Sequence, residues 1–264
     1  GPDGAVWGGE VLVCELATFE RVAHLAYVPL PGGDQAIRQP WRMAAVLLQH
    51  TFGDTFLELD LPVVQRLAHR PWPALARMIE RGVNSPLTSS LGRLFDGVAA
   101  LLGVRDVVQY EAQAAIELEM VAAPIGAGYP FAIHEHEDGP AEMDIRPMIR
   151  ALVEAIRRGD PLPEMAGRVH RTVAEMLLAA CELARHRHGP STVALSGGLF
   201  QNRLLLEQVL ELLSAAGFES YINRRVPPND GGLSLGQAAV AGARLEQRLT
   251  HALEEARPLP VSAP

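Results

Sequence analysis

A short segment near residue 196 carries residue types that often contact a phosphorylated ligand. The apolar run Val193–Leu195 ends at Ser196-Gly197-Gly198, and Asn202 follows one helical turn later. Glycines allow backbone amides to approach a phosphate or a ribose closely, and a side-chain amide can donate to the same ligand. The same pattern is typical of an ordinary tight turn between a strand and a helix, so the segment alone leaves both interpretations open.

Two further segments combine glycine with a carboxylate. Asp230 lies in Asn229-Asp230-Gly231-Gly232, where it could hold a metal ion or a ligand hydroxyl, although such a tetrapeptide is more often a turn with a helix cap. Trp7-Gly8-Gly9-Glu10 places two glycines inside a strand pattern, which indicates close approach of a ligand or a β-bulge. Both segments are candidates for ligand contact, and both also have a purely structural explanation.

Other reactive side chains have simpler explanations. Asp96 lies off the apolar stripe of its helix, so it is expected on a solvated face. His134 and His136 lie in an acidic loop without a third strong ligand nearby, which favours a solvated loop over a metal site. Cys181 lies in an apolar helical stretch and is expected to be a buried thiol, not a nucleophile.

The composition is that of a globular protein and excludes several classes of function. The chain has 264 residues, 48% of them hydrophobic, and its formal net charge of -8 argues against nucleic acid as a partner. All 23 basic residues are arginine, which excludes a Walker-type phosphate loop and a catalytic lysine in this chain. No apolar run is long enough to span a membrane. Two distant cysteines fit a reducing, cytoplasmic setting.

Hydrophobic periodicity predicts an α/β protein in four parts. These are a β-hairpin over 1–34, a helical insertion over 35–160, the rest of the α/β lobe over 161–248, and a tail over 249–264. The lobe contains two strand–turn–helix units in tandem, with strands at 192–195 and around 221–222, and its last helix is expected to end near Leu245. Residues 134–140 are predicted to be an exposed loop. Ligands of open α/β sheets bind beyond the carboxyl ends of the strands, so both glycine turns are expected at one crevice.

Seven short segments together are more specific than any one of them. They are Gly4 with Trp7-Gly8-Gly9-Glu10, Leu30-Pro31-Gly32-Gly33-Asp34, Pro40-Trp41-Arg42-Met43, Ser89–Asp96, Gln113-Ala114-Ala115, Leu195-Ser196-Gly197-Gly198 with Phe200-Gln201-Asn202, and Pro227–Gly232. In this order they resemble the HypF family, the carbamoyltransferases of [NiFe]-hydrogenase maturation. The resemblance covers residues 1 to about 245 and concerns the later part of the family's C-terminal transferase domain.

The resemblance implies a fold and a ligand. The family's domain is similar to the transferase subunit of threonylcarbamoyl tRNA modification and to actin-like ATPases. It implies a ribonuclease-H-like lobe with a large helical insertion, here lacking its first, central strand, and an adenylate (ATP or carbamoyl adenylate) held between two lobes beside a divalent metal, iron or zinc. The paired histidines of the family lie upstream of residue 1. We therefore expect an inactive fragment that does not bind metal alone.

The resemblance also implies roles for particular residues. The nucleotide-binding residues carried over by motif are Gly8, Gly9 and Glu10 at the phosphates, Asp96 at the ribose with Gln113 beside it, and Gly197, Gly198 and Asn202 on the other flank. Asp230 is carried over as a metal ligand. The sequence departs from the expected pattern at Ala112, where a glycine would allow close approach of the backbone.

The implied reaction begins with carbamoyl phosphate and ATP, which other domains convert to carbamoyl adenylate. This domain would then pass the carbamoyl group to the C-terminal cysteine of a partner, HypE, on the way to the cyanide ligands of the hydrogenase iron. Two other functions stay open. One is an O-carbamoyltransferase that acts on a small-molecule hydroxyl, and the other is a non-catalytic nucleotide-binding or interaction module.

Overall fold

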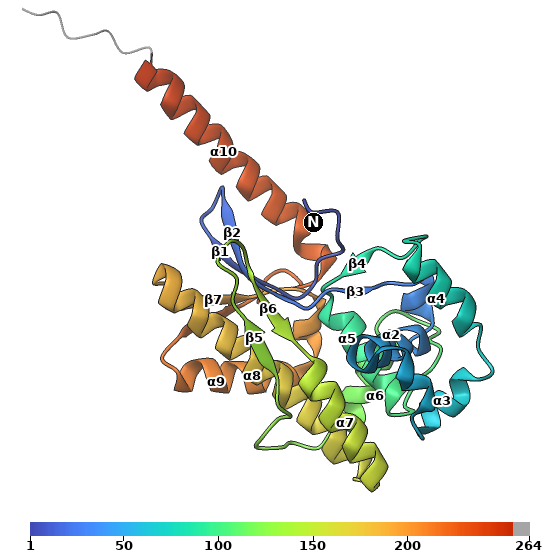
Figure 1. The fold of residues 1–264 in the computed structure, drawn as a ribbon. Helices are drawn as coiled ribbons and strands as arrows, with labels where there is room; N and C mark the ends of the chain where they lie inside the picture. Colours follow the sequence, from blue (N-terminus) through green and yellow to red (C-terminus); the bar gives the residue numbers. More distant parts are fainter. Residues whose placement is uncertain (256–264) are drawn as a thin grey trace, which may run out of the picture.

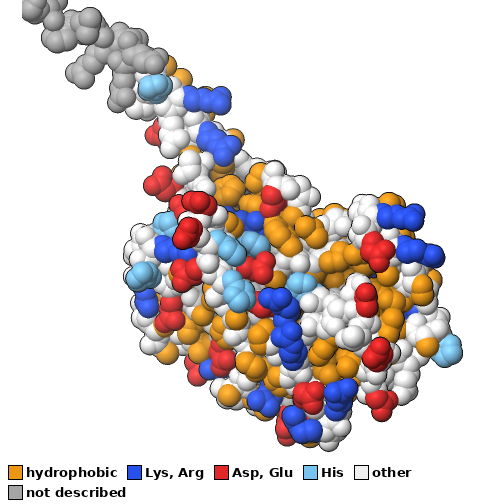
Figure 2. Space-filling model, viewed as in Figure 1, with side chains coloured by type: hydrophobic (Ala, Val, Ile, Leu, Met, Phe, Trp, Pro, Cys, Tyr) orange, Lys and Arg blue, Asp and Glu red, His pale blue; other side chains and the backbone are white. Residues whose placement is uncertain are grey.

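The longer strands gather in one half of the molecule and most of the short helices in the other (Figure 1). The structure is a computed structural model that describes residues 1–255. It confirms the predicted mixed α/β architecture, with a hairpin at the start and a strand–helix–strand–helix unit at the end. Acidic and basic side chains intermingle on the face shown in Figure 2, without one continuous patch of either sign.

The main sheet has four strands in the order β1-β2-β6-β5. Strands β1 (Glu10–Cys14) and β2 (Phe19–Leu25) form the predicted antiparallel hairpin. Strand β6 (Ala141–Asp144) pairs in parallel with β2, and β5 (Ala132–His134) pairs antiparallel with β6. The sequence did not predict β5 and β6, because three or four residues are too short to show an alternating pattern. The expected insertion therefore contributes two strands to the sheet, and the predicted loop is confined to residues 135–140.

Two smaller sheets stand apart from the main one. Strands β3 (Val28–Pro29) and β4 (Leu87–Thr88) pair antiparallel. Strands β7 (Thr192–Leu195) and β8 (Glu219–Ile222) pair in parallel and are joined by helix α9 (Arg203–Ala215). The predicted strand–turn–helix unit is confirmed, but its two strands form their own sheet and do not extend the hairpin.

The helical half is built around the packing of α2 against α5. The helices before β5 are α1 (Asp34–Arg38), α2 (Trp41–Phe52), the 3₁₀ helix η1 (Gly53–Glu58), α3 (Pro62–Leu67), α4 (Trp72–Glu80), α5 (Leu91–Leu101) and α6 (Gln113–Val121). The Ser90 side chain accepts from the Arg93 amide and so caps α5. Leu94, Phe95 and Val98 on its apolar stripe are buried. This half therefore has a continuous aliphatic and aromatic core.

Helix α8 (Leu162–His188) joins the two halves, because α6, α7 (Arg146–Arg158), α9 and the β-hairpin all pack against it. At 27 residues it is longer than any other helix in the described part of the chain. Four basic residues in its last turn complement the helix dipole. Gly189, with a φ of 86°, ends the helix in the left-handed conformation. Helix α8 is therefore the element around which the fold is arranged.

Helix α10 (Leu233–Glu255) projects away from the rest of the molecule (Figures 1 and 2). It continues past the predicted end near Leu245, and residues 249–255 of the predicted tail are helical; residues 256–264 lie outside the described chain. Leu235 and Leu249 on this helix are 59% and 57% exposed. Within residues 1–255, no helix combines the length and the apolar character needed to cross a membrane.

The close packing of α8 gives a testable prediction. A Cβ on Gly167 would lie 1.9 Å from the backbone oxygen of Ala123, so Gly167→Ala should lower the free energy of unfolding by about 2 kcal/mol, despite the better helix propensity of alanine. Gly242→Ala, on α10 with nothing near its Cβ, is the matched control and should raise stability by up to about 1 kcal/mol. Urea denaturation measures both. Equal changes in the two variants would contradict this packing.

Candidate functional site

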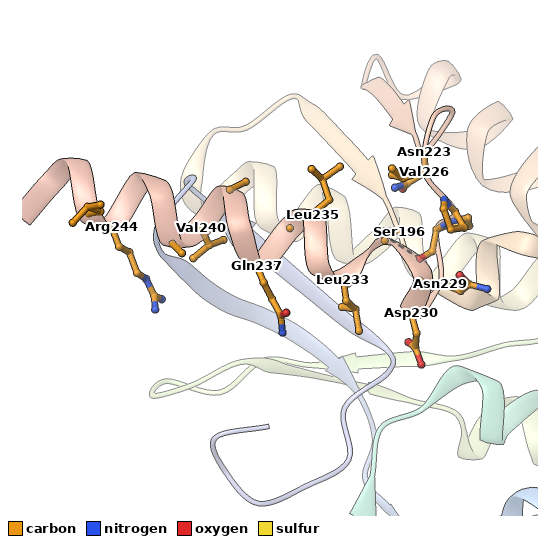
Figure 3. Close-up of a pocket in the computed structure, with 18 of the residues that line it drawn as sticks. Ser196, Asn223, Val226, Asn229, Asp230, Leu233, Leu235, Gln237, Val240 and Arg244 are labelled. Carbon is orange, nitrogen blue, oxygen red and sulfur yellow. Dashed lines mark hydrogen bonds between the residues drawn. The ribbon is translucent and has the colours of Figure 1, made fainter.

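The two C-terminal glycine segments border one open groove. The turn at 196–197, the loop at 226–232 and the first turns of α10 enclose a volume of about 1050 Å³. Figure 3 shows that Asp230, Leu233 and Gln237 project from the same side of the 3₁₀ helix η3 and of α10, which are continuous in sequence. The groove therefore presents a carboxylate, apolar surface and a side-chain amide together.

Gly197 is the residue that shapes the turn at the end of β7. Its φ of 105° and ψ of 155° are accessible to glycine and strained for other residues. Its amide donates to the Pro228 carbonyl at 2.7 Å, and the Ser196 hydroxyl lies 3.5 Å from the same oxygen (Figure 3). The turn is thereby joined to the loop that carries Asp230. Gly198 begins the 3₁₀ helix η2 (Gly198–Gln201) that leads into α9.

The N-terminus of α9 is already capped by protein groups. The Glu119 carboxylate, on α6, accepts from the amides of Arg203 at 2.7 Å and Leu204 at 3.1 Å. The Asn202 side-chain oxygen accepts from the Leu205 amide at 2.9 Å. The first three amides of the helix are thus satisfied. A phosphate at this helix end would have to displace Glu119, so the phosphate-binding interpretation is confined to the turn before η2.

Asn202 faces the protein interior. Its side chain is 9% exposed, and its Nδ2 lies 2.9 Å from Nε2 of the fully buried His170 on α8. Because its amide oxygen caps α9, both ends of the side chain have internal partners. Asp230 is exposed and lines the groove, whereas Asn202 does not. The two glycine turns therefore border one groove, as expected, but the Asn202 side chain does not line it.

The segment Trp7-Gly8-Gly9-Glu10 packs against the start of α5. A Cβ on Gly9 would lie 2.5 Å from the Ser89 carbonyl oxygen, so the close approach that requires a glycine is to the chain itself. Gly8 is exposed. Glu10 accepts from the Ser89 hydroxyl and from Nε of Arg21, and its side chain is 10% exposed. Contact of these residues with a nucleotide stays a prediction. In the structure, Glu10 joins β1 to the start of α5 through its hydrogen bond with Ser89.

Asp96 is buried at 2% exposure, which shows that its expected place on a solvated face was wrong. Arg93 Nη2 lies 2.9 Å from its Oδ2, one helical turn away on α5. The pair lacks hydrogen-bond geometry, and Asp96 Oδ2 has no hydrogen-bond partner among the described residues. Burial raises the pKa of Asp96 to about 6, and the nearby Arg93 charge partly opposes this shift. Contact of Asp96 with a ribose stays a prediction, and the structure shows the carboxylate enclosed beside Arg93.

Gln113 is also occupied internally. Its side-chain oxygen accepts from the Gln109 amide at 2.7 Å, and its Nε2 donates to Glu117 at 2.8 Å. Ala112, which precedes it, has a φ of 59° and a ψ of 9°. This is the left-handed conformation that favours glycine, and it is the position where the resemblance leads us to expect a glycine. Ala112 therefore holds a backbone conformation that is strained for a residue with a side chain.

Residues 1–252, whose side chains are described, contain no group of three or more His, Cys, Asp or Glu side chains that could hold a metal ion. Asp230 therefore has no companion ligands in this part of the chain. His134 Nε2 contacts Asp144 at 3.1 Å, so this histidine pairs with a carboxylate that Arg146 also binds. Burial raises the pKa of the Cys181 thiol to about 11, which keeps it protonated, as expected of a thiol that is not a nucleophile.

Three residues at these sites were not predicted from the sequence: Arg21, Glu119 and His170. Arg21 pairs with Glu10 across the hairpin, Glu119 caps α9 from 84 residues away, and His170 contacts Asn202 from the middle of α8. Each acts through a contact distant in sequence, and single charged or polar residues on helices carry no local signal of such a contact. Only the tertiary structure identifies them.

A family model described as "Carbamoyltransferase, Kae1-like Domain, second subdomain" matches residues 1–237, which defines the class of protein. Carbamoyltransferase HypF of Rhodobacter capsulatus is 38% identical over 252 residues, covering 93% of this chain and 31% of that protein. A carbamoyltransferase HypF homolog of Cupriavidus necator is 38% identical over 270 residues, covering 98% of this chain and 67% of that protein. The chain belongs to the HypF family of carbamoyltransferases.

Solved structures agree with this assignment. A crystal structure of full-length HypF in the phosphate- and nucleotide-bound form has a TM-score of 0.87 and 40% identity, covering 93% of this chain and 32% of that chain. The crystal structure of T. kodakarensis HypF has a TM-score of 0.78 and 28% identity. The mixed α/β fold is therefore that of the corresponding part of HypF, and the chain spans about a third of the length of these proteins.

The buried carboxylate of Asp96 gives a pH-dependent prediction. Its pKa rises from 3.8 to about 6 on folding, so its contribution to stability is greatest at low pH and is lost as the pH rises from about 4 through 6. Relative to wild type, Asp96→Asn should therefore gain about 2 kcal/mol of unfolding free energy between pH 4 and pH 7. Denaturant titrations across this range measure the difference.

The pH-dependent difference is informative because any fixed loss of the Arg93 contact cancels from it. Glu58→Gln, at an exposed carboxylate, is the control and should show no comparable trend, since that group is solvated in both states. A constant offset between wild type and Asp96→Asn at all pH values would contradict the burial of the charged form.

The strained backbone at Ala112 gives a second prediction. Ala112→Gly should raise the free energy of unfolding by about 1 kcal/mol, because it relieves a left-handed conformation that alanine adopts at a cost. Ala115→Gly, within the same helix at ordinary helical geometry, should instead lower stability by about 1 kcal/mol. Thermal and urea unfolding measure both. A loss in both variants would show that residue 112 is not held in the left-handed conformation.

Proposed function

We propose that this chain forms one wall of the carbamoyl-adenylate site of a HypF-type carbamoyltransferase. The observation that carries the proposal is the groove bordered by the Gly197 turn and the Asp230 loop, in a chain whose fold matches a nucleotide-bound HypF. The groove volume of about 1050 Å³ and its apolar and polar lining are suited to an adenylate.

The groove residues would act by positioning and by electrostatics. The backbone at Gly197 and Gly198 would approach the nucleotide, because no side chain blocks it there. Burial raises the pKa values of both Cys14 and Cys181, so neither thiol is activated as a nucleophile. The acceptor must therefore bring its own nucleophile, and this region would orient the adenylate and stabilise charge at its carbonyl.

The acceptor we propose is the C-terminal cysteine of HypE, in the cytoplasmic route to the cyanide ligands of a [NiFe] hydrogenase. Carbamoyl phosphate and ATP would supply carbamoyl adenylate. The cysteine sulfur would form a bond to the carbamoyl carbon while the bond from that carbon to the AMP phosphate oxygen breaks, and the thiol proton would pass to water. An assay with the full-length protein that contains this chain, using a thiol-ended HypE peptide against sugar acceptors, distinguishes this from O-carbamoyl transfer.

A divalent metal does not fit the described residues alone. Asp230 is a suitable oxygen ligand, but a tight site needs several convergent ligands and the described residues supply no cluster. An iron or zinc ion at Asp230 would need ligands from outside this part of the chain. We therefore assign no step of the reaction to a metal here.

The Gly197 turn provides the test of nucleotide binding. Gly197→Ala should weaken ATP binding about tenfold or more in calorimetry, because the turn cannot keep its φ of 105° with a Cβ. Gly217→Ala, at the far end of α9 with a φ of 76°, is the matched control, since it carries similar strain away from the groove. It should lose stability yet keep wild-type affinity. Absence of ATP binding by the full-length protein that contains this chain, or an equal loss of affinity in both variants, would contradict the proposal.

A further inference from the structure

A buried histidine lies directly behind the turn that borders the groove. His170, in the middle of α8, is fully buried, and both ring nitrogens have partners within the protein. Its Nδ1 lies 2.8 Å from the Ala166 carbonyl oxygen, and its Nε2 lies 2.9 Å from Nδ2 of Asn202. It has no role in the reaction proposed above, so its position calls for a separate explanation.

The partners define the protonation state of the ring. A carbonyl oxygen can only accept a hydrogen bond, so Nδ1 must carry the proton that is donated to Ala166. Nε2 then holds a lone pair, which accepts from the Asn202 amide group. Burial lowers the pKa of His170 and so favours this neutral form, although Glu119 acts in the opposite direction. The neutral Nδ1-protonated ring is the form that satisfies both contacts.

This contact also fixes which way the Asn202 amide points. With Nδ2 directed at His170, the amide oxygen is directed at the Leu205 amide and caps α9. The Asn202 backbone amide donates to the Leu199 carbonyl within η2. Asn202 therefore ends the turn and also caps α9 with its side chain. The Phe95 ring, on α5, packs edge-on against the His170 ring, with 4.9 Å between the two ring centroids.

We propose that His170 is a positioning residue for the nucleotide groove: it holds the Asn202 amide and thereby sets the turn from Ser196 to Asn202. The proposal rests on the proposed nucleotide-binding function of that turn. It assigns no contact between His170 and the ligand, because the side chain is fully buried.

The proposal predicts different results for two substitutions at this position. His170→Leu removes the acceptor and leaves the Asn202 amide group buried without a partner, so amide exchange across 197–206 should rise about tenfold. His170→Gln keeps an oxygen acceptor near the place of Nε2 and should stay close to wild type. Hydrogen–deuterium exchange of the full chain measures both, and ATP affinity by calorimetry should follow the same order.

Thr172→Val provides a matched control on the same helix. The Thr172 hydroxyl is buried, accepts from the Tyr129 amide at 2.6 Å and donates to the Arg168 carbonyl at 2.7 Å, so its hydrogen-bond partners lie outside the turn. This variant should lose stability while exchange at 197–206 and ATP affinity stay unchanged. If it loosens the turn as much as His170→Leu does, the effect belongs to α8 in general and the proposal is overturned.

A spectroscopic measurement on the unaltered chain tests the tautomer of His170 without depending on whether a variant folds. The ¹⁵N chemical shifts of the His170 ring should show a neutral imidazole protonated at Nδ1, and a ring protonated at Nε2 would overturn the proposal. If the full-length protein that contains this chain binds no ATP, the proposed function fails, and the exchange pattern and ring tautomer still decide whether His170 positions the turn. A fast-exchanging turn in His170→Gln would also contradict the role given to the acceptor.

Discussion

The closing of the N-terminus of α9 is the interaction on which the site depends. Three helices meet there, because Glu119 comes from α6, Asn202 caps its own helix, and His170 reaches it from α8. A charge-assisted cap at a helix N-terminus also gains from the helix dipole, so each contact is worth roughly 1 kcal/mol. The turn between β7 and α9 is thereby fixed from behind, and only its groove side is free to contact a ligand.

The glycines of the N-terminal motif and of the C-terminal motif serve different purposes. Gly9 is required because the Ser89 carbonyl lies where its Cβ would be, so this glycine joins β1 to α5. Gly197 has open space around it and is required by its backbone conformation. The first kind of glycine is explained by the packing of the chain alone. The second leaves an accessible backbone at a groove, which is the arrangement that a ligand can use.

The sequence was sufficient for the long periodic elements and for the family. Helix α9 follows from its apolar periodicity, and the short strand β7 was marked by the glycine turn that ends it. Strands β5 and β6 could not be predicted, since their pairing partners supply the information that their few residues lack. The sequence also could not predict the direction in which Asn202 and Asp96 point. A polar residue beside a turn or on a helix has the same local sequence pattern whether its partner is a ligand, water or a distant side chain.

The burial of Asp96 bears on how a carboxylate can serve this site. Charge is costly in so enclosed a place, and the raised pKa measures that cost. At 2% exposure Asp96 lies against Arg93, whose side chain keeps 14% of its surface exposed in the first turn of α5. That turn also lies against Glu10 through Ser89. The structure therefore gives Asp96 a part in fixing the start of α5, where the N-terminal glycine motif packs.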